Sequence, residues 1–195
     1  MGRPLAVAVT GGIAAGKSEA LAAFARHGAA VASSDEIVHR VYRDDETLQA
    51  ALRQRWGDGV FVDGAVDRAA VGRIVFGDRG ELDWLERQVH PRVVAEYGRW
   101  LAELRGSPDP PALAVVEVPL LYETGGDARF DRVVVVTASP GVRAARRSDF
   151  AAREARLIPD EEKLRRADFA FVNDGGLDAL DAFAAGVVEV LASSC

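Results

Sequence analysis

The chain has 195 residues, a length that suits a single domain spanning residues 1–195. Hydrophobic residues make up 49% and charged residues 28%, which excludes a disordered chain. The formal net charge is −6, so nucleic acid is not an expected partner, and no apolar run approaches the roughly 20 residues of a membrane-spanning helix. The single cysteine, Cys195, permits no intrachain disulfide and favours a reducing compartment, so we expect a cytoplasmic protein.

Five short apolar segments predict the strands of an α/β core. In chain order they are residues 5–10, 30–32, 113–118, 132–137 and 169–172. Their apolar residues are continuous rather than alternating, a pattern typical of strands buried on both faces of a parallel sheet. Residues 19–26 and 177–191 have the patterns of helices, and this alternation of strands and helices indicates βαβ crossovers.

The stretch 44–106 has a different pattern. Leu48, Leu52 and Trp56 are spaced by four residues, and a similar rhythm follows at 82–89, which predicts helices. Glycines between these helices indicate a turn-rich piece, and a loop rich in proline closes the stretch. We therefore predict a helical insert on the α/β core.

The strongest signal is a phosphate-loop sequence at residues 11–18, which reads Gly-Gly-Ile-Ala-Ala-Gly-Lys-Ser. It lies between a predicted strand and a predicted helix, as this motif requires. Glycines let successive N–H groups point into one concavity, and Lys17 and Ser18 are the residue types that bind nucleotide phosphates and Mg²⁺. The alternative is a glycine-rich turn that binds nothing. The motif predicts a P-loop NTPase-type α/β fold, with a parallel sheet of about five strands flanked by helices.

The other sequence motifs of a switch GTPase are missing. No glycine has an aspartate three residues before it, and the only asparagine, Asn173, is followed by Asp174 rather than lysine. Large ATPases need a longer chain. A small phosphate-loop kinase is therefore the favoured class.

Several short motifs accompany the phosphate loop in a fixed order. They are Thr10 with residues 11–18, Ser33-Ser34-Asp35, His90-Pro91, Val118-Pro119-Leu120-Leu121-Tyr122-Glu123, Glu161-Glu162-Lys163, Ala167-Asp168-Phe169 and Asn173-Asp174-Gly175. In this order and spacing, over nearly the whole chain, the sequence resembles the dephospho-coenzyme A kinase family. The resemblance implies transfer of the γ-phosphoryl group of ATP, with Mg²⁺, to the ribose 3′-hydroxyl of dephospho-coenzyme A, the last step of coenzyme A synthesis.

The resemblance also implies roles for single residues. The expected catalytic residues are Lys17, Asp35 and Arg147, and the expected metal ligand is Ser18. The expected ATP-binding residues are Thr10, Gly11, Gly12, Ile13, Ala14, Ala15, Gly16, Lys17, Ser18, Glu19 and Asn173. The expected contacts with the acceptor substrate are Asp35, His90, Pro119, Leu120 and Leu121. His90 lies in the insert 44–106, which is therefore expected to bind the acceptor.

The candidate acceptor-site residues each have a second interpretation. Asp35 follows a predicted strand at the sheet edge where ligands gather, so it fits an acceptor base, but it also fits the N-cap of a helix starting near Glu36. His90 precedes a proline and fits a helix-surface or core histidine. The apolar residues 119–121 could simply cover the core. For Glu117 and Glu123, contact with Mg²⁺ and contact with substrate both stay open.

An arginine-rich segment at about 143–165 is expected to form a short lid, several residues shorter than usual in the family. Its arginines either clamp the transferring phosphoryl group or form a solvated helix face. They are Arg143, Arg146, Arg147, Arg153 and Arg156. The resemblance places Asn173 near the adenine, although the residue also fits a turn.

A smaller departure from the family is Ala14-Ala15, where glycine and serine are more usual. Alanine is free of strain there only if φ is negative.

Two other function classes remain open. The chain could be another small phosphate-loop kinase acting on a nucleotide or nucleoside, or an ATP-dependent switch with little turnover. Asp35 favours a kinase, because a switch needs no acceptor base.

Overall fold

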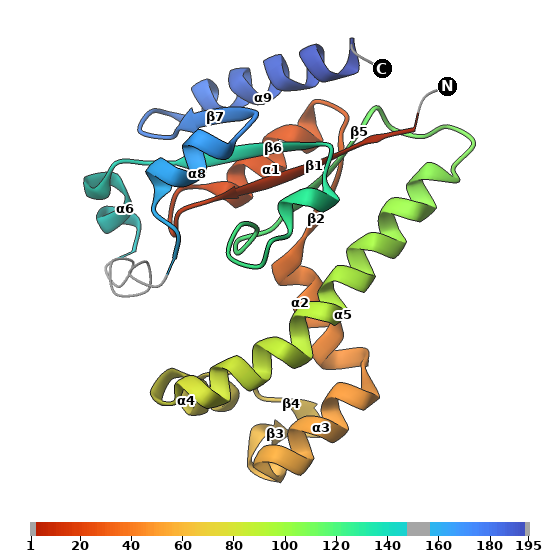
Figure 1. The fold of residues 1–195 in the computed structure, drawn as a ribbon, viewed down its shortest axis with the longest axis vertical. Helices are drawn as coiled ribbons and strands as arrows, with labels where there is room; N and C mark the ends of the chain where they lie inside the picture. Colours follow the sequence, from red (N-terminus) through yellow and green to blue (C-terminus); the bar gives the residue numbers. More distant parts are fainter. Residues whose placement is uncertain (1–2, 148–156, 194–195) are drawn as a thin grey trace. The chain divides into compact units, whose positions relative to one another are not determined.

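The computed structural model describes residues 3–147 and 157–193 (Figure 1). Within them, five parallel strands form one sheet in the order β2-β5-β1-β6-β7. The strands are β1 (Leu5–Gly11), β2 (Ala30–Ser33), β5 (Leu113–Glu117), β6 (Arg132–Thr137) and β7 (Phe169–Val172). The predicted fold class is confirmed, and the predicted bounds of β6 and β7 agree with the structure at both ends.

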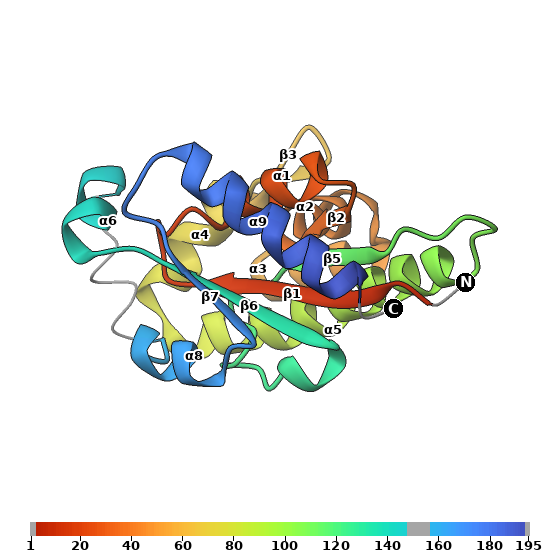
Figure 2. The same ribbon diagram turned by 90° about the horizontal axis from the view of Figure 1, so that it is seen from above.

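Both faces of the central strands are buried, as their continuous apolar sequences predict. On one face, α1 (Lys17–Arg26) and α9 (Leu177–Ala192) pack through Phe24, Leu180 and Ala184 against the sheet, and Figure 2 shows α9 running along it. On the other face, Leu121 and Tyr122 pack against the strands. A strand of this kind is stable only where both faces of the sheet are covered.

The strand register brings several predicted residues to one edge of the sheet. Val9 near the end of β1 pairs with Glu117 at the end of β5, and Thr137 at the end of β6 pairs with Val172. The phosphate loop follows β1, Glu117 ends β5, and Asn173 follows β7. The carboxyl edge of a parallel sheet is where α/β proteins bind ligands.

Two short helices flank the segment that lies outside the described residues. They are α6 (Pro140–Arg146) and α8 (Asp160–Arg166). The predicted lid, 143–165, includes parts of both, but Arg153 and Arg156 lie outside the described residues, as does Cys195. A 3₁₀ turn, η2 (Asp127–Arg129), precedes β6.

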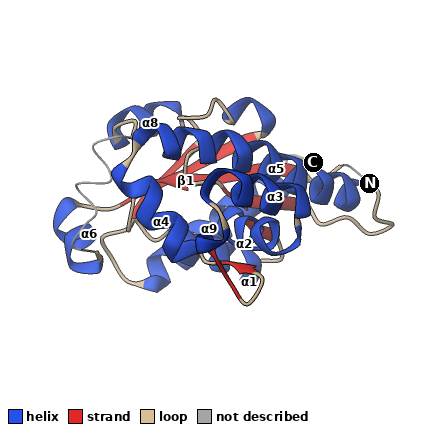
Figure 3. Ribbon diagram, turned by 90° about the horizontal axis from the view of Figure 1, so that it is seen from below, coloured by secondary structure: helices blue, strands red, loops and turns tan. Residues whose placement is uncertain are grey.

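Residues Ser34–Trp100 form a second compact unit between β2 and β5. Its helices are α2 (Ser34–Asp44), α3 (Glu46–Trp56), α4 (Arg68–Gly77) and most of α5 (Arg79–Arg105), shown in blue in Figure 3. This unit starts ten residues before the predicted insert, 44–106, because the unit includes α2. As an assignment of domains, 44–106 stays a prediction.

The turn-rich piece inside this unit has regular structure that the sequence analysis did not predict. A 3₁₀ turn, η1 (Asp58–Val60), leads into an antiparallel hairpin of β3 (Phe61–Val62) and β4 (Ala65–Val66). The two residues between these strands, Asp63 and Gly64, both have positive φ, as a tight hairpin turn requires. Among the described residues, no helix is long and apolar enough to cross a membrane.

Candidate active site

The phosphate loop leaves β1 at a glycine that has no room for a side chain. Gly11 has φ +142°, and a Cβ on it would lie 1.8 Å from the carbonyl oxygen of Val136 on β6. Gly16, at the start of α1, has φ +95°, and a Cβ there would lie 2.3 Å from Nδ2 of Asn173. Both positions therefore need glycine for conformation and for space.

The loop carbonyls are hydrogen-bonded by side chains around the loop. Lys17 Nζ donates to the carbonyl of Gly12 at 2.8 Å and to that of Gly11 at 3.3 Å. Arg143 Nε donates to the carbonyl of Ile13 at 2.8 Å. These bonds fix carbonyls of the loop, and the backbone N–H groups of such a loop are the groups that bind phosphate oxygens.

Two further carbonyls of the loop are bound in the same manner. Arg146 Nη1 lies 3.2 Å from the carbonyl of Ala14 and 3.3 Å from that of Ala15. Asn173 Nδ2 donates to the carbonyl of Ala15 at 2.9 Å, and its backbone N–H donates to Thr137. Asn173 is thus more than a turn residue, because its buried amide supports the loop; its predicted contact with adenine stays a prediction.

Ala14 does not have the negative φ that would free it from strain. Its φ is +59°, in the left-handed region, where a Cβ crowds the backbone. Ala15 is not among the described residues with positive φ, and its side chain is fully buried. The departure from the family pattern therefore has a conformational cost at Ala14 alone.

The arginines expected to act together have different environments. Arg143 is 4% exposed and bonded to the loop, so the interpretation of this residue as part of a solvated face is wrong. Arg146 is exposed but also binds the loop. Arg147 is exposed at the C-terminal end of α6, which suits contact with a ligand better than the buried position of Arg143 does.

An acidic residue that the sequence left undecided lies beside the end of the loop. Glu117, 5% exposed at the end of β5, has Oε2 3.5 Å from the hydroxyl of Ser18. A carboxylate and a hydroxyl are oxygen ligands of the kind that Mg²⁺ binds. Thr10, at the end of β1, is buried, and its Oγ1 lies 3.4 Å from the carbonyl of Pro119.

The residues that follow β5 mainly pack in the core or form ion pairs. Leu121 is fully buried in the core, so its position does not support a contact with the acceptor. Glu123 Oε1 lies 2.9 Å from Nζ of Lys163, whose side chain is 0% exposed, and accepts a hydrogen bond from the N–H of Ile158. Glu123 therefore belongs to a buried ion pair. Leu120 is half-buried within a turn.

Asp35 and His90 belong to the unit Ser34–Trp100. The alternative interpretation of Asp35 as an N-cap is wrong, because α2 already begins at Ser34 and Asp35 lies inside its first turn. The Asp35 side chain is exposed and available to a ligand. His90 is half-buried within α5, which continues through Pro91.

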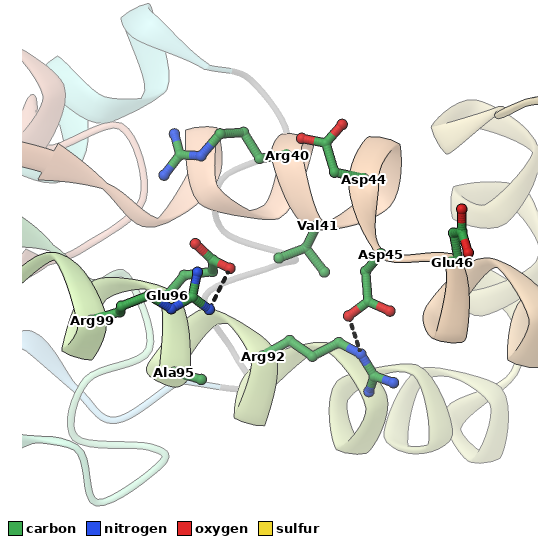
Figure 4. Close-up of a pocket in the computed structure, with 9 residues that line it drawn as sticks. All are labelled: Arg40, Val41, Asp44, Asp45, Glu46, Arg92, Ala95, Glu96 and Arg99. Atoms are coloured by element: carbon green, nitrogen blue, oxygen red, sulfur yellow. Dashed lines mark hydrogen bonds and ion pairs between the residues drawn. The ribbon is translucent and has the colours of Figure 1, made fainter.

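The same unit contains an open pocket of about 670 Å³ between α2 and α5 (Figure 4). Both signs of charge line it, and Asp45 forms an ion pair of 2.9 Å with Arg92. Burial by itself raises the pKa of Asp45, but hydrogen bonds from the Leu48 N–H and from Arg92 outweigh it and lower the pKa. Asp45 is also the N-cap of α3.

Sequence reasoning missed the acidic partner of Arg143. Asp160, at the start of α8, lies 3.0 Å from Arg143 Nη1 and beside Gly12. No sequence pattern marks it, because an aspartate in the first turn of a helix is common for reasons of helix stability alone.

Comparisons with known proteins show the family. A dephospho-CoA kinase from Mesorhizobium japonicum is 40% identical over 195 residues, covering 96% of each chain, and one from Rhodopseudomonas palustris is 39% identical over 95% of this chain and 94% of its own. A solved structure from Thermus thermophilus has a TM-score of 0.79 at 30% identity over both whole chains. A dephospho-CoA kinase structure from Campylobacter jejuni has a TM-score of 0.73 at 26% identity, covering 97% of this chain and 98% of that one. A sequence model of the dephospho-CoA kinase family matches residues 5–179, and the chain belongs to this family.

Proposed function

We propose that the protein uses ATP to phosphorylate the ribose 3′-hydroxyl of dephospho-CoA, giving CoA and ADP. The observation that carries this proposal is a complete phosphate loop at the carboxyl edge of the sheet in a member of this family. The single cysteine supports a cytoplasmic location, which cell fractionation tests.

The loop supplies the site for the triphosphate. The N–H groups of residues 11–18 and the N-terminus of α1 would hold the β- and γ-phosphates, with Lys17 moving from the loop carbonyls to the phosphate oxygens. Ser18 and Glu117 would hold Mg²⁺, which supplies charge neutralisation between the phosphates. Their oxygens fit such an ion in type.

Asp35 is the proposed acceptor base. It follows the carboxyl end of β2, whose last residue, Ser33, pairs with Glu117. In the transfer, the 3′-oxygen forms a bond to the γ-phosphorus, the bond from that phosphorus to the β,γ-bridging oxygen breaks, and the hydroxyl proton passes to Asp35. We assign contacts with the rest of the acceptor to His90, Pro119 and Leu120.

Arg147 is the proposed partner of the transferring phosphoryl group. Charge shifts onto the phosphoryl oxygens and the leaving ADP in the transition state, so an arginine placed there lowers the barrier more than it strengthens ATP binding. Arg147→Ala should therefore lower kcat by about 10-fold or more with a smaller change in the Kd for ATP. An effect confined to the KM for ATP would make Arg147 a ground-state contact.

The deciding experiment measures ADP release with and without dephospho-CoA. A dephospho-CoA kinase releases ADP in proportion to CoA formed and releases little without the acceptor. ATP hydrolysis that is indifferent to the acceptor would instead indicate a nucleotide switch. Faster turnover with a nucleoside or nucleotide than with dephospho-CoA would indicate a different acceptor class.

A further inference from the structure

A buried ion pair lies directly behind the phosphate loop. Arg143 from α6 and Asp160 from α8 approach to 3.0 Å, and their side chains are 5% and 18% exposed. Taking two charges out of water has a high cost, which their mutual attraction and further hydrogen bonds offset. Within the described part of the chain, Asp160 Oδ1 is buried without a hydrogen-bond partner, so the bonds of this carboxylate are concentrated on Oδ2. The further partners of these two side chains therefore indicate what the pair does.

Those partners join the loop to the sheet. Asp160 Oδ2, which binds Arg143 Nη1, also accepts a hydrogen bond from the hydroxyl of Thr137 at the end of β6. Arg143 Nε donates to the carbonyl of Ile13 at 2.8 Å. A continuous chain of hydrogen bonds therefore runs from β6 through Asp160 and Arg143 to the backbone of the loop.

The pair also fills the space beside Gly12. A Cβ on Gly12 would lie 2.8 Å from Arg143 Nη2 and 2.8 Å from Asp160 Oδ2. The pair thus touches the loop at two successive residues, sterically at Gly12 and through a hydrogen bond at Ile13. Both contacts limit rotation of the peptide groups of the loop at these two residues.

The charges of the pair fit a supporting role. A carboxylate alone beside an anion-binding loop would repel the phosphates, and Arg143 neutralises it. Asp160 in turn fixes the planar guanidinium so that Nε points to the loop rather than into the phosphate concavity. We propose that Asp160 and Arg143 are positioning residues: Asp160 orients Arg143, and Arg143 holds Gly12 and Ile13 in the conformation that binds nucleotide phosphates. This inference rests on the proposed function, since it needs a nucleotide in the loop.

The test compares Asp160→Asn with Asp178→Asn, which changes an exposed carboxylate in the first turn of α9. Both keep the side-chain size and remove one charge. The Kd for Mg-ATP is measured by calorimetry without acceptor, and KM values are measured for both substrates. Asp160→Asn should weaken ATP binding about 10-fold, the scale of a hydrogen bond to a charged group, with the KM for dephospho-CoA unchanged. Asp178→Asn should leave all three constants unchanged.

A double-mutant cycle shows whether Asp160 acts through Arg143. If it does, the double variant Asp160→Asn/Arg143→Met binds ATP no more weakly than Arg143→Met alone. If the losses of ATP affinity in the two single variants multiply in the double variant, Asp160 acts independently of Arg143, and the inference is overturned. A lower melting temperature of Asp160→Asn with unchanged ATP affinity would also overturn it, because that result indicates a structural role only.

The same measurements separate this inference from the proposed function. Wild-type protein that binds ATP but transfers nothing to dephospho-CoA contradicts the proposed function alone, because the ATP affinities of the variants still test the pair. Wild-type protein that binds no ATP contradicts both.

Discussion

At the scale of single residues, Asp35 is the proposed acceptor base. Its exposed carboxylate lies in the first turn of α2 and not at the N-cap, so helix capping no longer explains it. A ribose hydroxyl needs an ionised carboxylate nearby for alignment and for loss of its proton. A carboxylate in the first turn also stabilises its helix, so the acceptor-dependent rate is the measurement that tests its catalytic role.

Asp35→Asn should therefore keep ATP affinity and lower acceptor-dependent ADP release by roughly 10² or more, the scale of general-base catalysis. Asparagine has the size of aspartate but accepts no proton at neutral pH. Glu36→Gln, in the same helical turn, is the matched control and should keep full activity. An active Asp35→Asn enzyme would leave the acceptor base unidentified.

Ala14 offers a test of strain in the loop. At φ +59° an alanine is less stable than a glycine, so Ala14→Gly should raise the free energy of unfolding by about 1 kcal/mol. Ala15→Gly, in a buried position outside the left-handed region, should lower it instead. Urea denaturation of both variants measures the two effects, and changes of the same sign would contradict this account.

At the scale of elements, Asp45 links two helices of the unit Ser34–Trp100. Its carboxylate accepts a hydrogen bond from the N–H of Leu48 at 2.8 Å, which caps α3, and forms an ion pair with Arg92 on α5. The cap and the ion pair can be separated by substitution, because asparagine caps a helix about as well as aspartate does.

Asp45→Ala should lower the free energy of unfolding by about 1–2 kcal/mol, and Asp45→Asn by less than about 1 kcal/mol. The folded-state pKa of Asp45 is lowered, so its ionic contribution is complete above the unfolded value of about 4 and is lost as the pH falls through the folded pKa. The difference between wild type and Asp45→Asn should therefore shrink below about pH 4. Urea denaturation at several pH values checks this, and an equal loss at every pH would exclude the ion pair as its source.

At the scale of the whole molecule, the phosphate loop belongs to the unit that comprises Met1–Ser33 and Leu101–Cys195. A ligand that binds only the folded state stabilises the unit that holds it, by about 2.7 kcal/mol at 100 times its Kd. For a chain of this length that corresponds to roughly 5–10 °C in melting temperature.

Mg-ATP should raise the melting temperature of the wild type by this amount, and Lys17→Ala should abolish most of the shift as well as transfer. The Lys17 ammonium group hydrogen-bonds to carbonyls of the loop and does not pack in the hydrophobic core. The melting temperature of Lys17→Ala without nucleotide should therefore differ little from that of the wild type. Differential scanning calorimetry with and without Mg-ATP gives both values. A full shift in Lys17→Ala would mean that the nucleotide binds elsewhere.

Local patterns in the sequence determined the parallel sheet and the phosphate loop. Both rest on short windows: continuous apolar residues mark strands with two buried faces, and glycines with lysine and serine at fixed spacing mark the loop. The order of the motifs also indicated the family. The helical pattern of 44–106 indicated α3 and α5 of the second unit, but it gave no sign of α4, and the β3–β4 hairpin was too short to give a period.

Only the tertiary structure decided which side chains support the loop. Arg143 meets Ile13 across 130 residues of sequence, and Asn173 meets Ala15 across 158. No local pattern distinguishes buried Arg143 from exposed Arg147, because both belong to the same arginine-rich segment and differ only in which neighbours the fold brings to them. Propensity and periodicity act within an element, whereas burial, ion pairing and backbone strain depend on what packs against it.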